Sequence, residues 1–151
     1  MSSPGALPGV GVVYRATDEM PLLELALAAE QRGFSSLVLG EHTHIPVTSD
    51  PRNFPGAGDT IPRSYPRLLD PYIALAFVAA QTSLKIATCT SLPAQHDPIA
   101  LAKALATLDH LSRGRLTLGV GYGWNPDELV NHGHAWAYRR AVVREHVQLM
   151  R

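Results

Sequence analysis

The chain has 151 residues, and its 13 Lys and Arg residues balance 13 Asp and Glu residues, giving a formal net charge of zero at pH 7. This balance excludes a global electrostatic attraction to nucleic acid or to an anionic membrane, and no apolar stretch reaches the roughly 18 residues that a membrane span requires. The single cysteine excludes an internal disulfide; because the start MSSPGALPG resembles no signal peptide, we expect one cytoplasmic domain over residues 1–151.

The first third of the chain predicts two strands joined by a helix. Residues 9–16 (GVGVVYRA) form an apolar run typical of a strand. Thr17 or Asp18 is expected to cap a helix that ends at Gly33, because glycine readily adopts the conformation that stops a helix. Residues 35–42 (SSLVLGEH) predict the second strand.

A long loop rich in Pro and Gly follows over residues 43–69. Connections of this length are uncommon in compact domains, and many of them are lids or binding loops. Beyond it, we expect a helix from residue 70 to about 82 and a third strand over 84–92 (LKIATCTSL).

The remainder of the chain repeats the alternation of helix and strand. Residues 97–114 predict a helix, and residues 115–123 (RLTLGVGYG) predict the fourth strand. The pair Asn125-Pro126 is expected to cap a short turn, and a final helix begins near Trp136.

Pairs of a side-chain acceptor and a proline recur at residues 70, 97 and 125, as Asp-Pro, Asp-Pro and Asn-Pro. Such pairs favour the start of a helix, since the acceptor caps the first turn and proline lacks the N–H that would have no partner there. The spacing indicates a repeated strand–helix unit with continuously apolar, parallel strands. We therefore predict an α/β fold, either a doubly wound sheet or half of a (β/α)8 barrel.

The segment GEHTHIP places Glu41, His42 and His44 at the end of the second predicted strand. Two histidines at this spacing are found in metal-dependent hydrolases, but the fourth strand offers no further ligand. His42 also suits proton transfer, because an imidazole with a pKa of about 6.5 exchanges protons near neutral pH. A polar loop start without chemistry is the third interpretation, and these residues alone leave all three open.

The segment GVGYGW places Gly119, Gly121 and Gly123 at the end of the fourth predicted strand, followed by Trp124. The dinucleotide-binding fingerprint requires a glycine at the position of Trp124 and a helix directly afterwards, so this pattern does not match it. Alternating glycines nevertheless allow a flat ligand to approach the backbone, or else relieve crowding inside a barrel.

Small polar side chains also end the third predicted strand. Thr88, Thr90 and Ser91 can form hydrogen bonds with a planar polar ligand, whereas a lone cysteine such as Cys89 is commonly an inert buried thiol.

Several stretches together resemble one family. GFSSLVLGEHTHIP, DPIALAKALATLDHLS and SRGRLTLGVGYGW are similar to the N-terminal half of luciferase-like monooxygenases, and in particular to the oxidoreductases that use coenzyme F420. The resemblance covers the chain from about residue 9 onward. It implies a fold of the (β/α)8 TIM-barrel type, of which this chain provides about four βα units, with the cofactor ring at the carboxyl ends of the strands.

The resemblance also implies roles for individual residues. His42, preceded by Glu41, matches the catalytic position beside the reactive carbon of the cofactor. A non-prolyl cis peptide is expected between residues 88 and 91. Trp124 stands where some sugar-phosphate dehydrogenases of the family carry a catalytic glutamate, which is a departure from that chemistry. The residues expected to bind the cofactor are Thr88, Cys89, Thr90, Ser91, Gly119, Gly121, Tyr122, Gly123 and Trp124.

The implied function is an oxidoreductase or monooxygenase that uses coenzyme F420, or alternatively FMN, to transfer hydride to or from a small organic substrate or to oxidise it. Four strands leave two unpaired sheet edges, so we expect a homo-oligomer or a partner chain that completes the barrel. The alternatives are a truncated relative that only binds flavin or assists assembly, and a metal-dependent hydrolase that uses His42 and His44.

Overall fold

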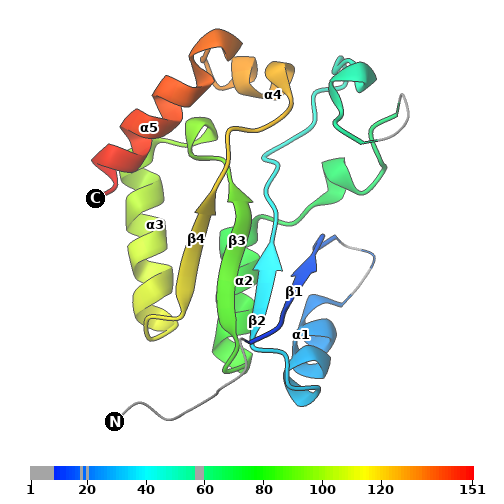
Figure 1. The fold of residues 1–151 in the computed structure, drawn as a ribbon, viewed down its shortest axis with the longest axis vertical. Coiled ribbons are helices and arrows are strands. Elements are labelled where there is room, and N and C mark those ends of the chain that lie inside the picture. The colour runs from blue at the N-terminus through cyan, green and yellow to red at the C-terminus, as the bar shows by residue number, and fades with distance from the viewer. Residues whose placement is uncertain (1–8, 18, 20, 57–59) are drawn as a thin grey trace.

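The computed structural model describes residues 9–17, 19, 21–56 and 60–151, and it confirms the α/β fold (Figure 1). Four parallel strands form one sheet in the order β1-β2-β3-β4. The strands are β1 (Gly11–Tyr14), β2 (Ser36–Leu39), β3 (Lys85–Ser91) and β4 (Leu116–Val120). The helices are α1 (Leu22–Gln31), α2 (Pro71–Gln81), α3 (Pro98–Leu111), α4 (Pro126–Asn131) and α5 (Arg139–Leu149).

The main core lies between the sheet and helices α1, α2 and α3. Leu37 and Leu39 of β2 and Ile86 of β3 pack there against Leu75 and Val78 of α2, and all five side chains are buried. A smaller cluster joins α4 and α5 to the short 3-10 helix η3 (Pro93–Gln95). No helix in the described part of the chain has the length and apolar character needed to cross a bilayer.

The three acceptor–proline pairs start helices, as expected. Asp70 accepts hydrogen bonds from the backbone of Tyr72 and Ile73, and Asp97 accepts one from Ala100. Asn125 caps α4 in the same way by accepting from the backbone N–H of Asp127. Asp97 and Asn125 stand shortly after β3 and β4, so α3 and α4 begin at the end of the sheet where these strands finish, whereas Asp70 follows the long loop.

Two expectations about element ends need correction. Helix α1 begins at Leu22 after Pro21, whereas Thr17 forms an isolated bridge with Leu68; Asp18 lies outside the described residues. The carbonyl of Pro21 accepts the first helical hydrogen bond, from the backbone N–H of Leu25. The first turn of α1 therefore begins later in the chain than it would with a cap at Thr17. The segment after Asn125 is a helix of 6 residues rather than a simple turn.

The long loop lies above the carboxyl ends of the strands (Figure 1). It contains two 3-10 helices, η1 (Pro51–Asn53) and η2 (Tyr65–Arg67), and it returns to the sheet where the backbone N–H of Leu69 donates to the carbonyl of Ala16. The loop therefore covers the edge of the sheet at which polar residues gather.

Candidate active site

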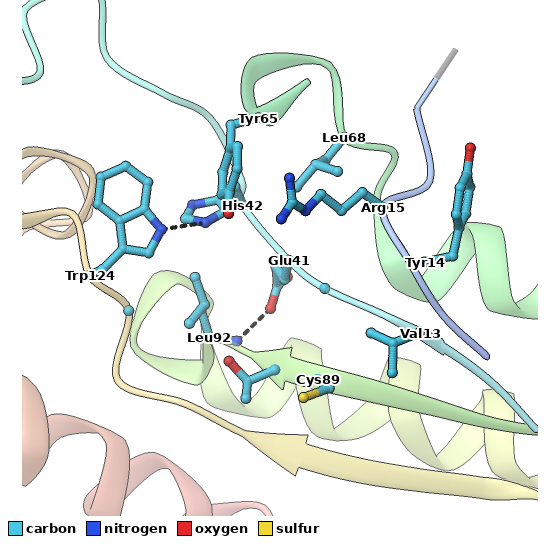
Figure 2. A pocket seen from close by; sticks show the side chains of 13 residues that line it. Val13, Tyr14, Arg15, Glu41, His42, Tyr65, Leu68, Cys89, Leu92 and Trp124 are labelled. Atoms are coloured by element: carbon cyan, nitrogen blue, oxygen red, sulfur yellow. Dashed lines mark hydrogen bonds between the residues drawn. The ribbon is translucent and has the colours of Figure 1, made fainter. Parts of the chain in front are cut away.

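A cavity of about 310 Å³ lies at the carboxyl ends of the strands (Figure 2). This volume falls near the lower end of the roughly 300–1,000 Å³ that is usual for small-molecule sites. The walls come from the ends of β1, β2 and β3, from the long loop and from the segment after β4. They comprise Val13, Tyr14, Arg15, Gly40, Glu41, His42, Tyr65, Leu68, Cys89, Thr90, Leu92, Gly123 and Trp124.

Both ring nitrogens of His42 have a partner. The Nδ1 atom lies 2.8 Å from Oε2 of Glu128, and Nε2 accepts a hydrogen bond of 2.9 Å from the indole N–H of Trp124 (Figure 2). A carboxylate only accepts and an indole N–H only donates, so the neutral ring carries its proton on Nδ1. The side chain of His42 is 7% exposed and that of Glu128 is fully buried.

Aromatic rings connect the long loop to this histidine. The ring of Tyr65 meets those of His42 and Trp124 at centroid distances of 5.2 and 5.9 Å, and Phe54 contacts both Tyr65 and Trp124. The guanidinium of Arg15 lies 5.2 Å from the centre of the Tyr65 ring and brings a positive charge to the cavity (Figure 2). The cavity thus combines flat apolar walls with a few polar groups.

Glu41 is buried and accepts three hydrogen bonds. Its carboxylate binds the hydroxyl of Tyr72 at 3.1 Å, the backbone N–H of Leu92 at 2.5 Å (Figure 2) and Nε2 of His96 at 2.6 Å. Burial alone lowers the pKa of His96, but the hydrogen bond and charge of Glu41, together with the charge of Asp70, raise it overall. Burial, reinforced by the charge of Glu41, raises the pKa of Tyr72.

Four of the nine residues expected to bind a cofactor line this cavity, namely Cys89, Thr90, Gly123 and Trp124. The peptide bond between Cys89 and Thr90 is cis and lies within the expected segment 88–91. Gly123 has a φ of +72°, a conformation that side chains on L-residues disfavour, so glycine suits this turn before Trp124.

The other five do not line the cavity, and most of them connect β3 to its neighbours. Thr88 bonds through its hydroxyl to the backbone of Gly119, and the buried Ser91 hydroxyl lies 2.6 Å from that of Tyr72. A Cβ atom on Gly119 would lie 2.2 Å from the carbonyl oxygen of Thr88. Gly121 is similarly close to Thr90, so both glycines permit the close approach of β4 to β3.

Tyr122 lies further out on the segment after β4. It is 51% exposed, and its ring is 5.8 Å from the guanidinium carbon of Arg140 on α5. Its side chain therefore faces α5 rather than the cavity.

The hydrolase hypothesis finds no support. The ring of His44 lies 3.0 Å from the hydroxyl of Thr43 and 3.0 Å from the side-chain amide of Asn131, whereas His42 engages Glu128 and Trp124. Across the described ranges, no three His, Cys, Asp or Glu residues are grouped so as to hold a metal ion.

Several residues at the site were not predicted from the sequence, among them Arg15, Tyr65, Tyr72 and Glu128. Glu128 had a weak local signal, because it is an acid in the first turn of a helix capped by an Asn-Pro pair. Its contact with His42, 86 positions earlier, has no local signal. Tyr65 lies in a loop without any periodic pattern, so nothing in its neighbourhood indicated that it would reach the cavity.

Comparison with known proteins identifies relatives along almost the whole chain. The family model described as luciferase-like monooxygenase matches residues 11–151. An uncharacterized protein of Mycobacterium tuberculosis, Rv0953c, is 49% identical over 129 residues, which cover 83% of this chain and 45% of that protein. An F420-dependent glucose-6-phosphate dehydrogenase of Amycolatopsis mediterranei is 30% identical over 149 residues, covering 93% of this chain and 40% of the enzyme.

Solved structures show the same architecture. Monooxygenase RslO1 of Streptomyces bottropensis has a TM-score of 0.68 and 30% identity, over 85% of this chain and 34% of its own. The oxygenating constituent of 3,6-diketocamphane monooxygenase of Pseudomonas putida, a type II Baeyer-Villiger enzyme, has a TM-score of 0.71 and 21% identity over 94% of this chain and 38% of its own. The chain therefore spans less than half the length of each of these proteins.

Proposed function

The chain belongs to the luciferase-like monooxygenase family, and from this premise we propose that it binds coenzyme F420, with FMN as the alternative, and provides the catalytic face of an oxidoreductase. The observation that carries the proposal is the cavity at the strand ends, in which His42 lies beside Trp124 and which Cys89 and Thr90 also line. The relative described as F420-dependent, at 30% identity, favours F420.

The cavity suits a planar, mostly apolar ring with polar edges. Its walls include Val13, Leu68 and Leu92, and its polar groups are few, as in most cofactor sites. Arg15 supplies a positive charge at the rim, where it can face an anionic or carbonyl edge of a ligand. These residues suit a flavin-type ring.

The cofactor, when bound, would supply the hydride or oxygen chemistry, and the chain would supply orientation and a proton carrier. We assign proton transfer to Nε2 of His42, since its Nδ1 is held by Glu128. Glu41 takes a supporting part, because its carboxylate holds the backbone of Leu92 in the cavity wall. The substrate is a small organic molecule that enters beneath the long loop.

The single cysteine provides a direct test of cofactor binding. Cys89 is exposed and lines the cavity, and no other thiol competes for an alkylating reagent. Saturating F420 or FMN should slow the alkylation of Cys89 by iodoacetamide, whereas NAD should leave the rate unchanged. If neither cofactor slows the alkylation of Cys89 relative to the free protein, the proposal is wrong.

The sheet edges support a proposal about assembly. β1 and β4 are the outer strands, and an apolar groove of about 480 Å³ beside β4 is lined by side chains that include Leu105, Leu118 and Val147. We propose that further strands complete a (β/α)8 barrel, contributed by a second copy or by a partner polypeptide. Light scattering on purified protein separates these cases, and a monomer that binds neither cofactor would favour a non-catalytic assembly role.

A further inference from the structure

We propose that Glu128 is a positioning residue that fixes His42 in its Nδ1–H tautomer, and that Trp124 covers the Nε2 atom of His42 until a ligand takes its place. The inference deepens the proposed function and rests on it for the identity of the ligand. The geometry that carries it is independent of any cofactor.

Glu128 is held so that it cannot turn away from the histidine. Its side chain is fully buried, Oε1 accepts the backbone N–H of Thr43 at 3.1 Å, and Oε2 lies 2.8 Å from Nδ1 of His42. A buried carboxylate that accepts from a ring N–H fixes both the tautomer and the orientation of the imidazole. The backbone bond adds a second anchor, since Thr43 directly follows the histidine in the chain.

Trp124 occupies the other ring nitrogen. An indole N–H can only donate, so the bond of 2.9 Å to Nε2 exists only while Nε2 keeps its lone pair. A protonated imidazole would direct a hydrogen at the indole N–H. Nε2 can therefore accept a proton only after the indole has moved away from it.

A ligand with a hydroxyl or N–H group can make the same hydrogen bond as the indole. When its O–H bond breaks, the proton forms the new Nε2–H bond, the electron pair stays on the ligand oxygen, and the imidazolium lies against the Glu128 carboxylate. Trp124 and His42 both line the cavity, so the exchange takes place where a ligand would bind. Substrates with an ionisable hydroxyl or N–H next to the reacting carbon are the class that this arrangement would select.

Nitrogen-15 NMR of the imidazole rings tests the role of Glu128 without cofactor. Thr43 and His42 bond to different oxygens of Glu128, and glutamine replaces one of these oxygens with an NH2 donor. The backbone N–H of Thr43 can only donate, so it keeps the amide oxygen, and the NH2 group is left facing Nδ1 of His42. At a pH at which histidine is neutral, about pH 8, we expect the Nδ1–H form of His42 to predominate in the wild type and to lose that predominance in Glu128→Gln. Glu128→Asp should restore part of it, and Glu145→Gln on the exposed face of α5 should behave as the wild type. An unchanged tautomer in a folded Glu128→Gln variant would overturn the assignment, and so would an Nε2–H form in the wild type.

The covering role of Trp124 is tested by chemical modification. Diethyl pyrocarbonate attacks the lone pair of neutral imidazole, and peptide mass spectrometry reports the rate at His42 alone. We expect Trp124→Phe to raise this rate by about tenfold. The loss of one hydrogen bond shifts the equilibrium between covered and uncovered Nε2 by about this factor. Trp136→Phe, which changes the only other tryptophan, should leave it unchanged. Equal rates in the wild type and Trp124→Phe would refute the covering role. Because neither measurement uses a cofactor, failure of F420 and FMN to protect Cys89 would remove the proposed function separately.

Discussion

The Oε1 atom of Glu41 and the Nε2 atom of His96 lie 2.6 Å apart and join the end of β2 to the turn before α3. The carboxylate raises the pKa of His96 despite its burial. A group whose pKa is higher in the folded state stabilises the fold below its unfolded pKa, and this contribution is lost as the pH rises through the folded value. The pair should therefore contribute most below about pH 6.5.

The first prediction concerns the pH dependence of stability. His96→Gln should lower the free energy of unfolding more at about pH 5.5 than at about pH 8.5, because only the protonated imidazole carries the charge that Glu41 stabilises. Urea denaturation at both pH values measures the difference. The exposed His110, near the end of α3, provides the control His110→Gln. An equal loss at both pH values would show that the ion pair does not contribute through its charge.

The second prediction distinguishes the loss of all the hydrogen-bond acceptors of Glu41 from the loss of its charge and one oxygen. Glu41→Ala should cost about 3–5 kcal/mol of unfolding free energy, since it leaves buried donors and His96 without their acceptor. Glu41→Gln should cost less, because one oxygen can still accept from Tyr72 and Leu92. Glu24→Ala, at an exposed position of α1, should stay within about 0.5 kcal/mol of the wild type. Equal losses for Glu41→Ala and Glu24→Ala in urea denaturation would contradict this account.

The third prediction concerns the contact between β3 and β4. Gly119→Ala places a Cβ atom 2.2 Å from the carbonyl oxygen of Thr88, so the strands must separate, at a cost of about 1–3 kcal/mol. At Gly40 the nearest atom, the carbonyl oxygen of Cys89, is 3.3 Å away, and Gly40→Ala should cost less. Thermal denaturation of both variants provides the comparison. A Gly40→Ala variant that is less stable than Gly119→Ala would show that strand spacing is not the limiting contact.

The fourth prediction addresses the catalytic assignment. In an active holoenzyme, His42→Ala should reduce kcat by about 10²–10⁴, the usual contribution of a general acid or base. Cofactor affinity should change far less, because the cavity has many other lining residues. Stopped-flow measurement of cofactor reduction, with fluorescence titration of binding, distinguishes the two effects. Full turnover in His42→Ala would show that another group transfers the proton.

The strands and helix caps were accessible from the sequence because their signals are local. Each apolar run contains the strand that the structure shows, and Asp70, Asp97 and Asn125 cap the helices that follow. The predicted start of α1 was wrong because a tertiary bridge between Thr17 and Leu68 competes with the local capping pattern.

The site was only partly predictable, and the reason is sequence separation. Glu41 and His42 were found because they end a strand, where polar residues interrupt an apolar run. Their partners Tyr72, His96 and Glu128 come from three other segments, and such pairings depend on how the strands align. The loop residue Tyr65 reaches His42 through ring packing, which leaves no periodic trace in the sequence.

The sequential order of the strands has a consequence for synthesis on the ribosome. Each strand pairs with the one made just before it, so the sheet can grow as the chain emerges. His42, however, precedes Glu128 by 86 positions, and at roughly 5–20 residues per second several seconds separate their appearance. During that interval His42 lacks the carboxylate that holds its proton on Nδ1. The nascent chain can therefore form the sheet before the hydrogen bonds of the candidate site are complete.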